Sequence, residues 1–289
     1  MLLFTQMNYA PGILALLSQA EDLAEVLLVP GALPVQRTIL GVQAIGDHSL
    51  SALDVRDTLT TLLSHAPGGG SNLGRQGVVS FGMPDRGRFR VSYFMQRGSL
   101  AASVLHVPLK IPRTAALLND PATVAAAEKA FRSFRSGLLV VIGSQPALTN
   151  AFVYALLNHV NENDARIVFI LESYTSFLLR HNQSVVVQCE IGSDVDNLEQ
   201  GMRTAFSLTP NILYVRDIIG PVDLHTVLKA AEARVFVVVT VSSLDVDTLF
   251  PGGRVPLDPA LVRGLWRLDR MEDGHLHLDM SAPVQPPQP

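Results

Sequence analysis

The chain has 289 residues, of which 48% are hydrophobic and 17% are charged, and its formal net charge is −4. A chain of this length usually makes more than one domain, so we expect two. The negative charge excludes a general attraction to nucleic acid or to an anionic membrane surface. The apolar runs are far shorter than the roughly 20 residues of a membrane-spanning helix, and the N-terminus lacks the basic start of a signal peptide. A single cysteine, Cys189, excludes an internal disulfide framework. We therefore expect a cytoplasmic protein without direct membrane insertion.

The first part of the chain predicts a mixture of helices and strands. The expected elements are a helix and a strand within 13–28, a strand or hairpin at 35–45, a helix at 51–63, a flexible loop at 65–71, and strands at 77–81, 88–95 and 100–107. We expect these elements to form an α+β domain over residues 1–107. Prolines at 108, 112 and 121 then indicate a linker over residues 108–121.

The second part of the chain alternates strands with helices. The expected elements are a helix beginning near Thr123, strands at 138–142, 167–171, 184–189, 212–215, 235–241 and 274–280, and helices at 151–160, 195–207 and 222–233. This alternation predicts a mainly parallel sheet with helices on both faces, over residues 122–280. Such sheets bind ligands at the carboxyl ends of their strands. The proline-rich residues 281–289 predict a disordered tail.

A segment resembling a phosphate-binding loop, Gly143–Asn150, follows the first of these strands. A working loop reads G-x-x-x-x-G-K-[ST], because glycines let backbone N–H groups approach phosphate, the lysine holds the outer phosphates and the hydroxyl binds Mg²⁺. Here Leu148, Thr149 and Asn150 stand at the last three positions. The segment is either a residual nucleotide site at a helix N-terminus or a plain strand-to-helix turn, and we favour the turn.

Two segments of the first domain carry a resemblance to a known family. Gly87-Arg88-Phe89-Arg90-Val91, followed by Phe94-x-Gln96-Arg97-Gly98, resembles the R-F-R-V-N…F-x-Q-R-G segment of PilT-like type IV pilus retraction ATPases, and Gly31-x-x-Pro34-x-x-Arg37 resembles their G-x-P-P-x-x-R hairpin. The resemblance covers most of residues 12–251 and implies a PAS-like N-terminal domain before a RecA-like domain. The family's helical C-terminal region has no counterpart after residue 251. The resemblance also implies that some of Arg86, Arg88, Arg90 and Arg97 face the nucleotide or a neighbouring subunit.

The same resemblance implies that the second domain lacks most of the family's residues for binding and hydrolysing ATP. The loop lysine falls at Thr149 and the Mg²⁺-binding hydroxyl at Asn150, while the acidic motif keeps only Glu172. Asp217 stands where the family has its catalytic glutamate, and Ser242 stands where it has a histidine. We therefore expect no catalytic residue, cofactor or metal. The vestigial positions are Gly143, Ser144, Leu148, Thr149 and Asn150 in the loop, and Glu172, Asp217 and Ser242 elsewhere.

From this resemblance we predict a catalytically inactive PilT-like pseudo-ATPase with a regulatory or structural role in the type IV pilus and twitching machinery. Its partners would be a pilus motor ATPase or pilus base proteins, and a hexamer would be its oligomeric form. The alternative is a weak or unconventional motor ATPase of the type IV pilus or the type II secretion system. In that case Asp217, Glu172 and arginines supplied by a neighbouring subunit would act on Mg²⁺–ATP. The interpretations differ at Arg216, which can pair with either carboxylate and remove the need for a ligand.

Overall fold

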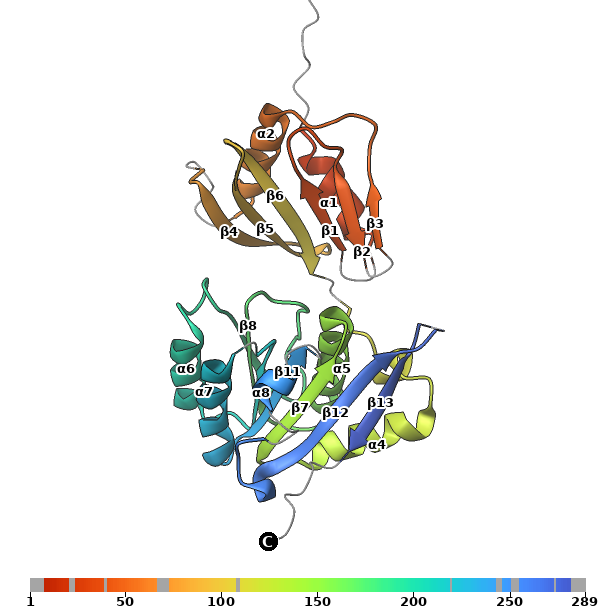
Figure 1. The fold of residues 1–289 in the computed structure, drawn as a ribbon, viewed down its shortest axis with the longest axis vertical. Helices are drawn as coiled ribbons and strands as arrows, with labels where there is room; N and C mark the ends of the chain where they lie inside the picture. Colours follow the sequence, from red (N-terminus) through yellow and green to blue (C-terminus); the bar gives the residue numbers. More distant parts are fainter. Residues whose placement is uncertain are drawn as a thin grey trace, which may run out of the picture. The chain divides into compact units, whose positions relative to one another are not determined.

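A computed structural model of the chain describes residues 8–20, 24–38, 41–66, 73–107, 110–218, 220–242, 246–250, 255–272 and 274–281 (Figure 1). Most of the loop expected at 65–71 and all of the tail after residue 281 lie outside these ranges. The chain divides into two compact units, residues 1–110 and 111–289, with residues 176–178 grouped with the first. Each unit is described by itself below.

The first unit is built on a six-stranded antiparallel sheet with the strand order β3-β2-β1-β6-β5-β4. Its strands are β1 (Ala24–Leu28), β2 (Val35–Thr38), β3 (Gly41–Ala44), β4 (Gln76–Met83), β5 (Gly87–Gln96) and β6 (Ser99–Val107). Its helices are α1 (Ala10–Ser18) and α2 (Ala52–Leu63).

One face of this sheet is buried under the two helices. Along β5, Phe89 and Val91 are fully buried and pack in one core cluster with Leu59 of α2. Helix α2 begins as its sequence predicts, because Ser51 and Asp54 form a capping box in which each side chain accepts the other's backbone N–H, at 3.1 and 2.8 Å. The predicted α+β character of this region is confirmed.

The second unit is built on a seven-stranded sheet with the order β13-β12-β7-β11-β10-β8-β9. Its strands are β7 (Gly137–Gly143), β8 (Ile167–Glu172), β9 (Val185–Glu190), β10 (Ile212–Val215), β11 (Phe236–Ser242), β12 (Val262–Arg270) and β13 (Leu276–Ser281). Its helices are α3 (Thr114–Leu117), α4 (Pro121–Ser133), α5 (Pro146–Asn163), α6 (Leu198–Leu208), α7 (Pro221–Glu232) and α8 (Val246–Leu249), with a 3₁₀ turn, η2, at Pro259–Leu261. Neighbouring strands are parallel except β12 and β13, which confirms the predicted mainly parallel sheet.

Helices cover both faces of this sheet. Leu138 and Val140 of β7 share a core cluster with Val227 of α7, whereas the ring of Phe131 on α4 meets that of Phe236 on β11 at 5.2 Å. Helix α5 follows β7 directly and carries Phe152 into the same core as Trp266 of β12, with a ring separation of 6.3 Å. Within the described ranges, no helix is both long and apolar enough to cross a membrane.

Several boundaries differ from the sequence-based expectations. Helix α4 is capped by Asp120, whose carboxylate accepts the backbone N–H of Thr123 at 2.8 Å, so Thr123 lies inside the helix. Helix α5 begins at Pro146 and not at Ala151, because proline at the first helical position needs no N–H acceptor and has a preset φ. Residues 114–117, expected in a linker, form α3, and strand β12 was not predicted.

One buried histidine in the first unit predicts a pH-dependent stability. The His106 side chain is 3% exposed, and its Nε2 donates to the carbonyl oxygen of Arg86 at 2.7 Å. Burial lowers the pKa of His106, and the hydrogen bond to Arg86 opposes this only in part. The unfolded chain therefore binds more protons as the pH falls below the ordinary histidine value of about 6.5, so acidification destabilises the fold.

We expect the free energy of unfolding to fall as the pH falls from about 7 to 5, and the His106→Gln variant to show a flatter dependence. Urea unfolding followed by circular dichroism measures this, and the fluorescence of Trp266 identifies the transition of the second unit. The control is His48→Gln, because the His48 side chain is 67% exposed. An unchanged slope in His106→Gln would contradict the assignment.

Candidate functional site

The carboxyl ends of the parallel strands bring together residues that are distant in sequence. The β7–β11 register places Gly143 beside Ser242, and the β8–β9 register places Glu172 beside Glu190. Asp217 lies two residues beyond the end of β10, between these pairs in the strand order. The structure thus gathers Gly143, Glu172, Asp217 and Ser242 at the edge where such sheets bind ligands.

The loop between β7 and α5 is short. Only Ser144 and Gln145 separate the strand from the helix, so Leu148 and Thr149 lie in the first helical turn. The backbone N–H and the side-chain hydroxyl of Thr149 both donate to the carbonyl oxygen of Gln145, each at 3.0 Å. Because Pro146 has no N–H, the N-terminus of α5 presents few donors to an anion. The segment is a short strand-to-helix connection in the structure, and the absence of a nucleotide site there stays a prediction.

Gly143 has a packing role in this turn. A Cβ atom added at Gly143 would lie 2.0 Å from Oγ1 of Thr149, whose side chain is only 3% exposed. Thr149 therefore occupies the space next to the Gly143 backbone. At this position glycine is required by the neighbouring threonine, whether or not a phosphate ever approaches.

Asn150 is hydrogen-bonded to Tyr214 of the sheet. Its Oδ1 accepts a hydrogen bond from the Tyr214 hydroxyl at 2.5 Å, and Asn150 is 2% exposed. The Tyr214 hydroxyl also lies 3.4 Å from Oγ1 of Thr240, which accepts the backbone N–H of Asp217 at 2.8 Å. The Asn150 side chain thus belongs to a chain of hydrogen bonds within the protein.

Glu172 has its own set of partners. Its carboxylate accepts a hydrogen bond from the Tyr154 hydroxyl, which in turn accepts one from Nε2 of Gln188 at 2.9 Å. Glu172 is 1% exposed, and Tyr154 and Tyr214 are fully buried, with their rings edge to face at 6.0 Å. Burial raises the pKa of both tyrosines well above the ordinary value, and the negative charge of Glu172 adds to this. Both phenols are therefore neutral donors.

Arg216 balances the acidic groups at this edge. Its Nε lies 2.8 Å from Oδ2 of Asp217, and Nη1 lies 4.0 Å from Oε2 of Glu172. Nη2 donates to the Tyr174 hydroxyl at 2.8 Å, and the guanidinium carbon lies 4.3 Å from the centre of that ring. Burial lowers the pKa of Arg216, but Tyr174 and the two carboxylates outweigh it and raise the pKa overall, so Arg216 stays charged. The sequence indicated a pairing of Arg216 with either carboxylate, and the structure places it close to Asp217 and at a longer distance from Glu172.

Asp217 differs from the other members of the network. Its backbone is left-handed, with φ 54°, a conformation that aspartate tolerates better than most residues. Its side chain is 38% exposed, whereas that of Arg216 is 5% exposed. Asp217 is therefore the carboxylate of this network that can meet solvent.

The four candidate arginines of the first unit do not form one cluster. Arg86 lies in the turn before β5 and Arg97 in the turn after it, so the ten residues of β5 separate them by about 30 Å. Arg88 and Arg90 share one face of β5, as the strand alternation predicted, and are partly buried, whereas Arg86 and Arg97 are exposed. Only Arg86, Arg88 and Arg90 lie close together along the strand.

The residues that complete the network were not identified from the sequence. Tyr154 and Tyr214 stand inside otherwise apolar runs, in α5 and β10. A buried tyrosine needs a hydrogen-bond partner for its hydroxyl, so a tyrosine in such a run was the available signal. The described residues include no group of three or more His, Cys, Asp or Glu side chains placed to hold a metal ion.

The contact of Gly143 with Thr149 predicts a specific pattern of stability. Gly143→Ala should lower the free energy of unfolding by roughly 1–3 kcal/mol through overpacking, and Thr149→Ala in the same chain should recover part of this loss. Urea unfolding followed by the fluorescence of Trp266, the single tryptophan, measures both. Gly220→Ala is the control, because its added Cβ would meet nothing within 4 Å. Additive effects of the two changes would exclude the packing role.

Comparisons with known proteins agree with this architecture. No protein-family model matches the chain. The type IV pilus ATPase PilU of Pseudomonas aeruginosa is 24% identical over 132 residues, which are 46% of this chain and 33% of PilU. A twitching motility protein of Neisseria gonorrhoeae is 25% identical over 153 residues, which are 53% of this chain and 40% of that protein. The matched regions thus span less than half the length of either relative.

Solved structures cover more of the chain. The pilus retraction motor PilT, solved with bound ADP, superposes with a TM-score of 0.71 at 22% identity, covering 92% of this chain and 81% of PilT. The ATPase DotB of Legionella pneumophila gives a TM-score of 0.66 at 16% identity, covering 95% of this chain and 80% of DotB. The chain therefore has the fold of the PilT and DotB ATPases, and its sequence is related to those of PilU and the twitching motility protein.

Proposed function

We propose that the chain is a catalytically inactive PilT-like pseudo-ATPase, with a regulatory or structural role in the type IV pilus machinery. The observation that carries this proposal is the closed network at the carboxyl edge of the second unit. There Asn150, Glu172 and Asp217 contact other side chains of the protein, namely Tyr214, Tyr154 and Arg216. The loop residues Gly143, Ser144, Leu148, Thr149 and Asn150, together with Glu172, Asp217 and Ser242, are then vestigial.

The charge at this edge supports the proposal. Arg216 faces two carboxylates, Glu172 and Asp217, so this group of three carries a net negative charge. A nucleotide triphosphate is itself strongly negative, and like charges in a partly buried site repel one another. The phosphates would therefore meet repulsion where a working site supplies a lysine.

The residues do not fit Mg²⁺–ATP in two further respects. Leu148 stands where backbone must approach phosphate closely, and Thr149 is turned into the protein against Gly143. Asn150 lacks the hydroxyl that binds Mg²⁺, and its side-chain oxygen is occupied by Tyr214. Binding would have to break these buried hydrogen bonds, and leaving such a group unsatisfied costs about 1–3 kcal/mol.

The second candidate function is a weak motor ATPase that uses Asp217. The specific observation in its favour is that this carboxylate is partly exposed on a left-handed residue at the ligand-binding edge. Aspartate is one methylene shorter than glutamate, and a misplacement of about 1 Å costs on the order of 10²-fold in rate. The inactive form is therefore the stronger proposal.

The pilus role rests on the relatives PilU and the twitching motility protein. By this proposal, the chain binds a pilus motor ATPase or a protein of the pilus base, and a ring of six copies is its oligomeric form. Arg88 and Arg90, on one face of β5, would then contribute to a subunit interface. The proposed domain division is an N-terminal domain over residues 1–107, a linker over 108–121 and the degenerate ATPase domain over 122–280.

Nucleotide binding separates the two functions. Isothermal titration with Mg²⁺ and ATP or ADP, up to about 1 mM, should give no binding heat, and phosphate release should stay at background. The matched variant is Asp217→Asn, which keeps the size of the side chain and removes its charge. Binding with turnover that disappears in Asp217→Asn would overturn the inactive assignment and establish the weak motor.

The regulatory role predicts an effect on another enzyme. Adding the purified chain to the pilus motor ATPase of the same genome should change the ATP hydrolysis rate of that motor, in either direction, by about fivefold or more. Replacing Arg88 and Arg90 by glutamine together should remove most of this effect, whereas Arg203→Gln, at an exposed site on α6, should retain it. No effect at saturating concentration would argue against this partner.

A further inference from the structure

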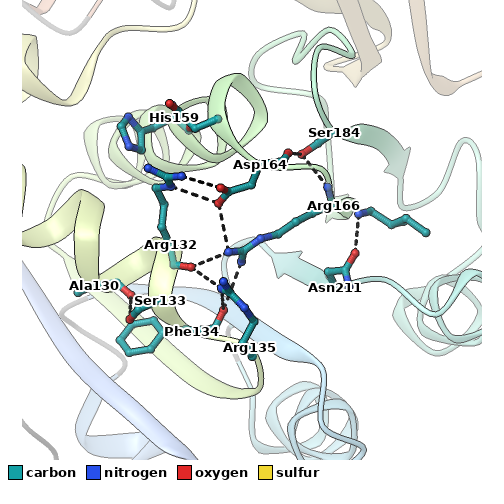
Figure 2. A network of polar contacts seen from close by, with 12 residues as sticks. Ala130, Arg132, Ser133, Phe134, Arg135, His159, Asp164, Arg166, Ser184 and Asn211 are labelled. Atoms are coloured by element: carbon teal, nitrogen blue, oxygen red, sulfur yellow. Dashed lines mark hydrogen bonds and ion pairs between the residues drawn. The ribbon is translucent and has the colours of Figure 1, made fainter.

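A group of basic side chains lies at the amino edge of the parallel sheet, opposite the edge described above. Arg132 is in the last turn of α4, Arg135 precedes β7 and Arg166 precedes β8. Arg132 and Arg166 contact Asp164 at the end of α5, and Arg135 lies beside Arg166 (Figure 2). We call Arg132, Arg135, Arg166 and Asp164 the amino-edge cluster. Strand β7 alone has seven residues, so about 20 Å separates this cluster from Gly143.

The single carboxylate of the cluster is fully engaged by two of the arginines. Nε and Nη2 of Arg132 donate to the two oxygens of Asp164, at 3.2 and 2.6 Å, and Nη2 of Arg166 donates to Oδ2 at 3.2 Å. The hydrogen bonds from Arg132 lower the pKa of Asp164, so this carboxylate is ionised at neutral pH. Asp164 therefore has little capacity for a third cation.

Arg135 is the third cation. Its Nη1 donates to the carbonyl oxygens of Arg132 and Phe134, at 2.5 and 3.2 Å, which fix the side chain at the C-terminal end of α4 (Figure 2). Arg135 is exposed and makes no ion pair with any carboxylate in the described part of the chain. Its guanidinium is thus oriented by the backbone and still directed at solvent.

The positive charges of the cluster disfavour one another. Burial lowers the pKa of Arg166, and the charge of Arg135 lowers it further, while Asp164 compensates only in part. Two cavities of about 460 and 400 Å³ adjoin the cluster and share Arg135 and Asp164 in their walls. Their walls hold four basic side chains and two carboxylates: Lys129, Arg132, Arg135 and Arg166 against Glu128 and Asp164. An added anion would relieve this imbalance.

The shape and lining of the cavities indicate what kind of anion fits. Small-molecule sites are mostly enclosed and apolar, with aromatic walls. Here the remaining walls include Ser133, Asn163 and Asn211, and His159, which lies 3.6 Å from Glu128, is the aromatic ring in them. This lining is mostly polar and charged, and it offers adjoining hollows that share one arginine, Arg135. Arginine binds carboxylates in a two-pronged geometry.

We propose that the amino-edge cluster is a docking site for an acidic segment of a partner protein, with Arg135 as its central contact. Carboxylates of the segment bind Arg135 and its neighbour Lys129, while the backbone carbonyl oxygens of Arg132 and Phe134 hold the Arg135 side chain in place. The site lies away from the former nucleotide edge, so docking does not depend on nucleotide. The inference is independent of whether the chain hydrolyses ATP.

Fluorescence anisotropy on the full chain tests this proposal, with a labelled octaglutamate peptide as the probe and an octaglutamine peptide as the neutral counterpart. At low salt the acidic peptide should bind and the neutral one should not, and binding should weaken with added salt. Arg135→Gln should weaken binding by about fivefold or more, and Lys129→Gln should weaken it further. Both residues are exposed, so circular dichroism should show both variants folded.

The matched control is Arg203→Gln, because Arg203 is an exposed arginine on α6 that pairs with Glu199. It should leave the affinity within about twofold. Equal binding by Arg135→Gln and the unmodified chain would overturn the proposal. Inorganic phosphate that displaces the peptide more effectively than an equal concentration of free octaglutamate would also overturn it, because the site would then select a small oxyanion and not an acidic segment.

Discussion

The second unit depends on how one buried carboxylate is neutralised. Glu172 ends a central strand of a parallel sheet with almost no contact with water, where an isolated negative charge would be very costly. Arg216, at the end of the neighbouring strand, supplies the compensating charge, and Tyr154 supplies a hydrogen bond to the remaining lone pairs. Removing one member of a buried ion pair typically lowers the free energy of unfolding by about 3–5 kcal/mol. The residues around Glu172 and Arg216 must therefore accommodate both side chains.

The rest of the carboxyl edge follows from this constraint. In the position where Arg216 faces Glu172, it also contacts Asp217 and the ring of Tyr174. Tyr214 donates its hydrogen bond to Asn150. At this edge one arginine thus faces two carboxylates. The amino edge has the reverse property, since three arginines share one acid and, by our proposal, Arg135 binds an external partner. The two edges of one sheet thereby carry an excess of opposite charge.

Local signals in the sequence were sufficient to predict many of the helices and strands. They predicted few of the hydrogen bonds and ion pairs at the carboxyl edge of the second unit. Helix α2 was predictable because its capping box and its apolar spacing lie within a few residues of one another. The start of α5 was missed because Pro146 was taken as part of a loop, although proline favours the first helical position. The polar contacts were beyond reach, since Asn150 and Tyr214 lie 64 residues apart and meet only through the strand order. Strand β12 was missed because its apolar positions do not alternate regularly.

Residues 149 and 150, at the end of the loop that resembles a phosphate-binding loop, are each fitted to a neighbouring residue. A lysine at position 149 would have to leave the pocket beside Gly143, because the existing side chain already lies where no further atom fits. A hydroxyl residue at position 150 would leave the Tyr214 hydroxyl without its present acceptor in a fully buried place. Either of these two substitutions alone would therefore lower the free energy of unfolding, whatever affinity for phosphate it added. The inward-facing turn at Thr149 and the hydrogen bond of Asn150 to Tyr214 therefore both depend on the residues now present at these positions.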